Sequence, residues 1–361
     1  MNNDEQYLLR ALELAKNARA ISSPNPAVGC VIVKDRQIIG AGFTQPPGGN
    51  HAEIEALNDA AGKGHDVRGA TVYVTLEPCS HFGRTPPCCD ALIRAGVARV
   101  VAAIQDPNPQ VAGQGLARLA AAGIEVECGV EADAAREMNI GFFSRMQRGK
   151  PWVRMKVAAS LDGKTALADG QSQWITSQAA RDDGHAWRAR TGAILTGIGT
   201  VNADDPQMTV RALDVMRQPQ RIVIDSKLDI RPEARVLAGG GTWVVAAQSN
   251  PAKEALLRDI GCEVILLPDS TGKVDLPALM QELGRRQINE LHVEAGCKLN
   301  GSLVRAGCVD ELLLYLAPCL IGDGMPMFAL GALESLQHKR QLRFHEVRQI
   351  GVDMRILARF N

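Results

Sequence analysis

The sequence is short of aromatic residues and carries no net charge. Aromatic residues make up only 4% of the chain, and the formal net charge at pH 7 is zero. Neither half has the excess of basic residues that binding to a phosphate backbone requires. The composition therefore argues against a nucleic acid as the usual partner, although a local basic patch is compatible with a neutral total.

Long apolar runs and a basic leader segment are also missing. The chain has no stretch of about 18 apolar residues that would span a bilayer. Its N-terminal segment is acidic and then amphipathic, unlike a signal peptide, which starts with basic residues followed by an apolar run. We therefore expect a cytoplasmic protein with no membrane partner. The nine cysteines are then expected to be thiols or metal ligands rather than disulfides.

The remaining composition is typical of a globular α/β enzyme. Hydrophobic residues make up 46% of the 361 residues, enough for a core in each of two domains. Short apolar runs with β propensity, such as 28–33 and 99–104, alternate with amphipathic helical segments, such as 52–61 and 88–95. This alternation predicts a sheet with helices packed on its faces.

The alternation stops and restarts near 147–151, where charge, glycine and proline together predict a linker. A second α/β series follows. Its tail, 343–348 and 354–360, predicts a closing antiparallel hairpin. We therefore expect two domains, which cover residues 1–149 and 150–361.

The most specific pattern is His-Ala-Glu followed by Pro-Cys-Ser-His-Phe-Gly-Arg-Thr-Pro-Pro-Cys, which predicts His51, Cys79 and Cys88 as metal ligands. One imidazole and two thiolates suit zinc, and three protein ligands leave a fourth position for water, as in a catalytic site. Zinc lowers the pKa of such a water from about 15.7 to about 7. Glu53, at the start of a predicted helix, is placed to accept a proton from the water and pass it to a leaving amine.

This pattern is the zinc deaminase signature except for one spacing. The signature has Pro-Cys-x-x-Cys, whereas eight residues separate Cys79 from Cys88 here. Cys79 follows a predicted strand and Cys88 opens a predicted helix, whose N-terminus stabilises a thiolate, so both suit a site at a sheet edge. Two alternatives remain: a structural zinc site with Cys89 or His81 as fourth ligand, and ordinary buried thiols with a core histidine. Cys30, in the middle of a strand, is expected in the core.

Two further segments make the comparison with a known family specific. Together with the motifs above, PNPAVGCVIV upstream and QDPNPQVAGQG downstream resemble the deaminase domain of the bifunctional riboflavin biosynthesis protein. In that family the eight-residue insert is the normal form of the motif. The resemblance implies a cytidine-deaminase-like three-layer α/β/α domain, with zinc on the three ligands above and Glu53 as the proton shuttle.

The resemblance also implies substrate contacts from Asn25, His81 and Arg84. A guanidinium such as that of Arg84 matches the oxygens of a ribose phosphate. From the residues alone, Asn25 is also explained as a turn residue before proline, and Arg84 as a solvated loop residue.

The second half has no Gly-x-Gly-x-x-Gly motif in a Rossmann context. Thr196–Thr200 follows an apolar strand and offers backbone N–H groups to a phosphate, which alone is a weak signal. The segments KVAASLDGKTA, SQWITS, AILTGIGTVNADDP, IVIDS and HVEAGCKLNGSLV, in this order, resemble the reductase domain of the same family. The resemblance implies a dihydrofolate-reductase-like α/β domain in which NADPH supplies a hydride.

Within this domain the resemblance assigns individual contacts. Those to the cofactor are Ala158, Trp174, Thr200, Asp204, Ser226, Gly296, Cys297, Lys298, Leu299, Asn300, Gly301 and Ser302. Those to the substrate are Lys156, Ser172, Arg188, Met208, Arg211 and Glu294. Arg188 and Arg211 suit a phosphate because a guanidinium forms paired hydrogen bonds with it. From the residues alone, Lys156 is also explained as a strand-end surface lysine and Trp174 as a packing aromatic, and Asp162 is expected in a turn.

As a member of this family, the chain is expected to catalyse two consecutive steps. Hydrolytic deamination of 2,5-diamino-6-(5-phosphoribosylamino)pyrimidin-4-one comes first, and NADPH then reduces the ribosyl group of 5-amino-6-(5-phosphoribosylamino)uracil to ribityl. The partner is thus a small phosphorylated pyrimidine, and a homo-oligomer, dimer or tetramer, is expected. Three alternatives predict other activities: a nucleic-acid deaminase with an unrelated appendage, a non-catalytic zinc-stabilised module, and a deaminase whose second domain is a vestigial scaffold.

Overall fold

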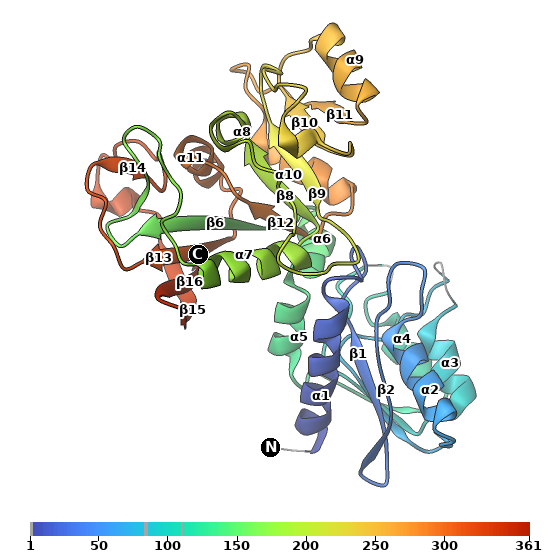
Figure 1. Ribbon diagram of the computed structural model, residues 1–361. Coiled ribbons are helices and arrows are strands. Elements are labelled where there is room, and N and C mark those ends of the chain that lie inside the picture. Colours follow the sequence, from blue (N-terminus) through green and yellow to red (C-terminus); the bar gives the residue numbers. More distant parts are fainter. Residues whose placement is uncertain (1–2, 83–85, 110) are drawn as a thin grey trace. The chain divides into compact units, whose positions relative to one another are not determined.

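The computed structural model describes residues 3–82, 86–109 and 111–361, and the chain forms two compact units, Met1–Gly149 and Lys150–Asn361. Each unit has its own sheet and its own hydrophobic core. Figure 1 colours the first unit from blue to teal and the second from green to red. Among the helices of the described ranges, none has both the length and the apolar character that crossing a membrane requires.

The first unit is built on a five-stranded sheet in the order β2-β1-β3-β4-β5, in which β1 is antiparallel to β2 and β3, and β3, β4 and β5 are parallel. The strands are β1 (Gly29–Lys34), β2 (Gln37–Phe43), β3 (Thr71–Val74), β4 (Arg99–Ala102) and β5 (Glu125–Cys128). The helices are α1 (Asn3–Ala18), α2 (Ala52–Gly62), α3 (Cys88–Ala95), α4 (Gln114–Ala121), α5 (Ala132–Met138) and α6 (Ile140–Arg148). Helices α1 and α5 lie on one face of the sheet, and α2, α3 and α4 lie on the other (Figure 1).

Helix α1 packs very closely on β1. Its residues Leu8, Leu12 and Ala15 recur at helical spacing and are buried against the sheet. The helix comes this close because Gly29 in β1 has no side chain: a Cβ there would lie 1.9 Å from the carbonyl oxygen of Ala11.

The second unit is built on a nine-stranded sheet in the order β11-β10-β9-β8-β12-β6-β13-β16-β15, which is parallel except that β16 is antiparallel to β13 and β15. Its strands are β6 (Trp152–Ser160), β8 (Ala193–Gly197), β9 (Gln220–Ile224), β10 (Trp243–Ala246), β11 (Glu263–Leu266), β12 (Glu290–Val293), β13 (Glu311–Ala317), β15 (Leu342–Ile350) and β16 (Asp353–Phe360). A small separate sheet pairs β7 (Lys164–Leu167) with β14 (Gly324–Pro326).

The helices of the second unit connect these strands and cover the sheet (Figure 1). They are α7 (Gln178–Arg190), α8 (Ile198–Asp204), α9 (Pro251–Asp259), α10 (Leu276–Arg285) and α11 (Cys297–Arg305), with short 3-10 turns at η1 (Arg235–Leu237) and η2 (Leu336–His338). The predicted closing hairpin is confirmed as β15 and β16.

The linker prediction was wrong in part. Residues 147 and 148 belong to α6, and Gly149 ends that helix in the left-handed conformation, so the connection to β6 is shorter than expected. Helices α5 and α6 were not predicted from the sequence. In α6 the five residues from Ile140 to Ser144 are all buried, and the basic residues Arg145 and Arg148 follow them, so this helix is amphipathic and its pattern could have been recognised.

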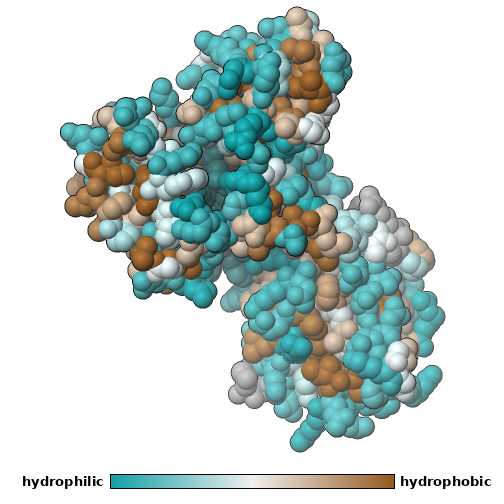
Figure 2. Space-filling view, viewed as in Figure 1, coloured by the Kyte–Doolittle hydropathy of each residue, from teal (hydrophilic) through white to brown (hydrophobic). Residues whose placement is uncertain are grey.

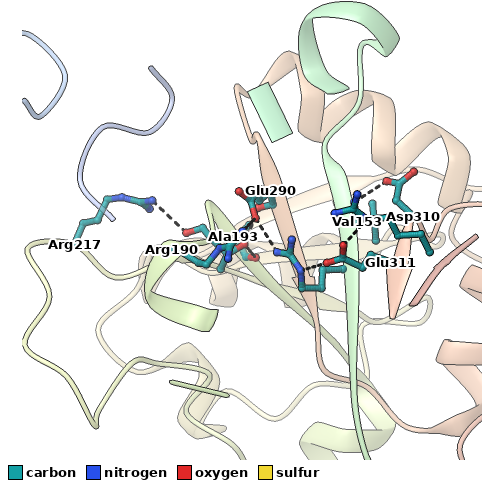
Figure 3. Close-up of polar contacts among 10 residues, drawn as sticks. Val153, Arg190, Ala193, Arg217, Glu290, Asp310 and Glu311 are labelled. Carbon is teal, nitrogen blue, oxygen red and sulfur yellow. Dashed lines mark hydrogen bonds and ion pairs between the residues drawn. The ribbon is translucent and has the colours of Figure 1, made fainter. Parts of the chain in front are cut away.

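Buried charged side chains form a set on the face of the second sheet that α7 covers. Arg154 on β6 donates to Glu311 Oε1 at 2.5 Å and to Glu290 Oε2 at 2.7 Å. Glu290 also lies 3.5 Å from the guanidinium of Arg190 on α7 (Figure 3). Glu311 accepts a second hydrogen bond, from Arg359 Nε at 2.9 Å. Arg154 is 1% exposed, and its burial is tolerated because carboxylates on both sides compensate its charge.

Replacing Arg154 with leucine should destabilise the second unit. The change leaves Glu290 and Glu311 buried with fewer positive partners, and breaking such a pair costs about 3–5 kcal/mol. Hydrogen exchange of the β6 and β13 amides, read by mass spectrometry, measures the local loss. The control Arg343→Leu, at an exposed position of β15, should leave exchange unchanged. Equal exchange in Arg154→Leu and the wild-type chain would contradict the account.

Candidate functional site

Three ligand atoms from distant parts of the sequence converge in the first unit. His51, Cys79 and Cys88 each offer one such atom, and these atoms all lie within 4.8 Å of one another. His51 Nδ1 is 3.6 Å from Cys79 Sγ and 3.3 Å from Cys88 Sγ. An imidazole nitrogen and two thiols at this spacing form a donor set that fits zinc and leaves a fourth position open.

Two helix starts bring these ligands together. His51 is the N-cap residue of α2, Cys88 is the first residue of α3, and Cys79 lies in the loop after β3. The Cys88 thiol donates to Cys79, and the backbone N–H of Cys88 donates to Cys79 Sγ at 3.3 Å. These hydrogen bonds lower the pKa of Cys79, which favours its thiolate form.

Glu53 lies in the first turn of α2, directly beside the metal ligands. Its side chain is 3% exposed. Burial raises the pKa of Glu53 to about 7, and the negative charge of Cys79 adds to the shift. A carboxyl group that titrates near neutral pH is suited to both accepting and returning a proton.

The alternative of a four-ligand structural site finds no support in this geometry. Cys89 is fully buried, and its thiol donates to the carbonyl oxygens of Pro78 and Gly115 at 3.3 and 3.5 Å. His81 is exposed, and within the described residues neither it nor Cys89 belongs to the converging set. Cys30 is fully buried in β1, so its prediction as a core residue is confirmed.

Two of the three predicted substrate contacts of this unit, Asn25 and His81, lie in loops. Asn25 sits in the turn before β1, where its backbone N–H donates to Ser22 O at 2.8 Å and its carbonyl accepts from Ser22 Oγ at 3.2 Å. The turn role of Asn25 is therefore confirmed, and its contact with a pyrimidine stays a prediction. His81 is exposed in the loop between β3 and α3, and Arg84 lies outside the described residues.

Glu77, which the sequence motifs did not single out, organises the surroundings of the metal ligands. Its buried carboxylate accepts backbone N–H groups at 2.8–3.3 Å, two from the loop between β4 and α4 and two from the first turn of α4, namely those of Asp106, Gly113, Gly115 and Leu116. The loop and the start of α4 are thereby fixed against the strand end that leads to Cys79. The sequence did contain a signal for this role, because Glu77 is an acidic residue at the end of an apolar strand. A carboxylate that is buried at such a place needs several hydrogen-bond donors around it.

The second unit contains a cavity of about 1300 Å³ at the carboxyl ends of parallel strands. Figure 2 shows the unit hollowed there, with mostly hydrophilic side chains around the hollow. The predicted residues that line the cavity are Lys156, Ala158, Ser172, Trp174, Arg188, Thr200, Asp204, Ser226, Met208, Arg211, Glu294, Gly296, Cys297, Lys298 and Leu299. These predicted residues come from six segments of the sequence, and the fold brings them together around one cavity.

Three predicted cofactor contacts lie elsewhere on α11, away from this lining. Asn300 donates to the carbonyl oxygen of Met327 at 3.3 Å, and Ser302 donates to that of Lys298 at 3.1 Å. Gly301 faces the backbone of Ala329, where a Cβ would lie 2.3 Å from the carbonyl oxygen. These contacts lie within α11 or join it to the segment 327–329, and the predicted cofactor contacts of the three residues stay predictions.

Arg188 and Glu294 form a two-point ion pair in the cavity wall. Arg188 donates from Nε to Glu294 Oε1 at 2.5 Å and from Nη2 to Oε2 at 2.8 Å. Its Nη1 donates to the Thr209 carbonyl at 2.9 Å, so Arg211 is the better placed of the two arginines for a phosphate. Burial raises the pKa of Glu294, but the Arg188 guanidinium outweighs it and holds that pKa well below its usual range.

Lys156 lies beside this pair and not at the surface of a strand end, so that alternative was wrong. It is in the middle of β6, and burial lowers the pKa of its ammonium group. Trp174 is 70% exposed, with the Arg181 guanidinium 4.5 Å from its ring centre, so it is not a packing aromatic. Asp162 accepts from the N–H groups of Ile321 and Gly322, which confirms its structural role.

The cavity also has basic residues that no motif indicated. These are Arg181, His185, Lys227, Arg235 and Lys273. Arg181 and His185 belong to α7, and the other three come from segments between the main helices and strands, where the sequence has no periodic pattern to mark a site.

Comparisons with known proteins identify the family of each unit. Residues 151–356 match the RibD C-terminal domain, and residues 1–104 match the cytidine and deoxycytidylate deaminase zinc-binding region. The chain is 49% identical to the riboflavin biosynthesis protein RibD of Escherichia coli K12, over 97% of this chain and 98% of that protein. The chain belongs to the RibD family. It is thus a bifunctional deaminase and reductase of riboflavin biosynthesis.

Solved structures of the RibD family cover the whole fold. Acinetobacter baumannii RibD is 41% identical with a TM-score of 0.91, and 99% of each chain is covered. The diaminohydroxyphosphoribosylaminopyrimidine deaminase/5-amino-6-(5-phosphoribosylamino)uracil reductase of Thermotoga maritima is 32% identical with a TM-score of 0.88, again over 99% of each chain. The predicted fold class is confirmed: a cytidine-deaminase-like domain followed by a dihydrofolate-reductase-like domain. The first domain is a zinc-binding region, and the reductase implies a nicotinamide cofactor.

Replacing Cys79 with serine should remove most of the zinc. A serine hydroxyl is a poor substitute for a thiolate, and the affinity should fall by more than about 100-fold, because even partners outside the ligand set are worth about 10- to 100-fold. Metal analysis after dialysis against a weak chelator measures the content. Cys89→Ser, at the neighbouring buried thiol, should keep it. Equal zinc in both variants would exclude Cys79 as a ligand.

Proposed function

We propose that the first unit, residues 1–149, removes an amino group from 2,5-diamino-6-(5-phosphoribosylamino)pyrimidin-4-one. Water adds to the amine-bearing carbon, and ammonia leaves. The observation that carries this proposal is the convergence of His51, Cys79 and Cys88 beside the buried Glu53. Zinc bound to these three residues supplies a Lewis acid that makes a neighbouring water acidic enough to react near neutral pH.

Glu53 moves the proton in this step. Its carboxylate accepts a proton from the attacking water and transfers it to the amino group that departs. A pKa of about 7 supports this role, because the group then holds and releases a proton at similar cost. Asn25, His81 and Arg84 are proposed to hold the pyrimidine and the ribose phosphate.

The second unit, residues 150–361, is proposed to reduce 5-amino-6-(5-phosphoribosylamino)uracil. NADPH bound in the cavity would supply a hydride for C1′ of the opened ribose. The Lys156 ammonium is placed in the cavity wall to donate the accompanying proton, and its lowered pKa makes it a better acid. Arg211 is proposed to bind the phosphate of the substrate. The preference for NADPH over NADH stays a prediction. The cytoplasmic location and the homo-oligomeric state also stay predictions.

Replacing Glu53 with glutamine should reduce ammonia release by about 100- to 10,000-fold, which is the usual contribution of a general acid–base group. Ammonia is measured with the diaminopyrimidine substrate, and zinc content should stay unchanged. Glu55→Gln, on the same helix, is the matched control and should retain the rate. Undiminished ammonia release in Glu53→Gln with full zinc would refute the assigned role. Zinc-dependent ammonia release from tRNA or single-stranded DNA would favour a nucleic-acid deaminase instead.

Replacing Lys156 with methionine should slow NADPH oxidation with the deaminated substrate by about 100-fold or more, because the proton donor is lost. Ammonia release by the first unit should be unaffected. NADPH absorbance follows the reaction, and Lys164→Met on β7 serves as control. If no NADPH were oxidised even by the wild-type chain, the second unit would be a scaffold.

A further inference from the structure

His185 is a half-buried histidine in the wall of the reductase cavity, and none of the assigned roles uses it. It lies on α7 three residues before Arg188, and residues three apart lie on the same face of a helix. Both side chains line the cavity. His185 is therefore placed to act together with Arg188 on whatever this face of α7 contacts.

This face of α7 holds the segment that carries Arg211. The backbone N–H of Arg211 donates to His185 Nδ1 at 3.3 Å. Two residues earlier in the segment, the carbonyl oxygen of Thr209 accepts from Arg188 Nη1 at 2.9 Å. The helix thus fixes the segment through two backbone groups, and His185 contacts the backbone of Arg211 itself.

The residues on the two sides of Arg211 differ in their environment. Before it, Met208 is 3% exposed in a hydrophobic core, and the side-chain amide of Gln218 accepts from the N–H of Val210 and donates to its carbonyl oxygen, at 2.8 and 3.0 Å. After it, residues 212–214 are exposed. His185 therefore holds the chain at the point where it leaves the core.

The direction of this hydrogen bond determines the form of the His185 ring. A backbone N–H only donates, so Nδ1 of His185 is the acceptor and carries no hydrogen. The ring is then neutral, with its hydrogen on Nε2. A doubly protonated ring carries a hydrogen on both nitrogens and accepts none, so protonation of His185 would break the contact with Arg211.

The charges that face His185 favour the neutral ring. Burial lowers the pKa of His185, and the guanidinium groups of Arg188 and Arg211 act in the same direction. The carboxylates of Glu294 and Asp182 act against them, and the net shift is downward. His185 is therefore neutral at physiological pH, and its Nδ1 atom is available to accept.

We propose that His185 is a positioning residue of the reductase site, which holds Arg211 in place for the phosphate of the substrate through its acceptor atom Nδ1. Arg188 is already engaged with Glu294 and Thr209, so the phosphate depends on Arg211. Fixing the backbone of Arg211 reduces the conformational entropy that is lost when the guanidinium binds. This inference rests on the proposed phosphate role of Arg211.

Kinetics of His185→Leu and His185→Asn at neutral pH test the proposal. Leucine has no acceptor, so the KM for the deaminated substrate should rise by about 3- to 10-fold, which corresponds to the loss of one hydrogen bond. The KM for NADPH, the kcat of NADPH oxidation and the rate of ammonia release should not change. Asparagine places an amide oxygen close to the position of Nδ1 and should keep the wild-type KM.

Ala186→Ser, at an exposed neighbouring position of α7, is the control and should also keep the wild-type KM. An unchanged KM in His185→Leu would overturn the proposal. An equal rise of the KM in His185→Asn and His185→Leu would do the same, because the accepting atom would then not matter.

The pH dependence of the KM gives a readout that a merely structural role would not change. The substrate phosphate itself titrates near pH 6, so the wild-type chain is compared with His185→Asn at each pH. The ratio of the two KM values should be constant above neutral pH and rise by about 3- to 10-fold on the acid side, because the protonated ring no longer accepts from Arg211. A flat ratio would contradict the proposal. So would a ratio that falls, since the imidazolium would then bind the phosphate directly.

Nitrogen-15 NMR of labelled histidine examines the contact without any turnover. The resonances that disappear in His185→Asn should show a neutral ring with its hydrogen on Nε2 at neutral pH. A hydrogen on Nδ1 would overturn the proposal, because this atom could then not accept from Arg211.

Arg211→Met separates this inference from the proposed function. If this change left the KM for the deaminated substrate unaltered, the phosphate role of Arg211 would be wrong, and the inference would fall with it. If it raised the KM while His185→Leu did not, the phosphate role would stand and only the role of His185 would be wrong.

Discussion

The convergence of His51, Cys79 and Cys88 within 4.8 Å is the constraint on which the deaminase half depends. Two of these residues are placed by helix starts at one edge of the first sheet, and the third follows the strand between them. The same geometry buries Glu53, because the first turn of α2 carries both His51 and the carboxylate. One short segment of backbone thus positions both a metal ligand and the carboxylate that transfers the proton.

In the reductase half, several charged side chains lie in the cavity wall. Arg188 comes from α7, Glu294 directly follows β12, and Lys156 comes from β6. Each of these charges has a partner of opposite sign nearby. Deeper in the same face, Arg154 is compensated by Glu290 and Glu311. Buried charges without such partners would strongly destabilise the fold. Because the charges in the cavity wall and those around Arg154 are each compensated, this face of the sheet can hold charged residues.

Sequence patterns predicted those parts in which local periodicity or a motif carries the information. The metal ligands, Glu53 and most strands are of this kind, and the family resemblance supplied most of the cavity residues. The role of Glu77 was not predicted because it arises from four backbone donors that are distant in the sequence, in the segment before α4 and in the first turn of that helix. Helix α6 was not predicted, although its buried residues and its terminal arginines form an amphipathic pattern. Asn300 was predicted to contact the cofactor from its position in a motif; its amide donates to Met327 O in this structure, and the cofactor contact stays a prediction.

X-ray absorption at the zinc edge tests the central claim of a three-ligand site most directly. For the wild-type chain reconstituted with zinc, the account predicts two sulfurs at about 2.3 Å and two lighter ligands at about 2.0–2.1 Å, of which one is the His51 nitrogen and the other is water. A first shell with three or more sulfurs, or with no sulfur, would contradict it, because the open position beside Glu53 would then not exist.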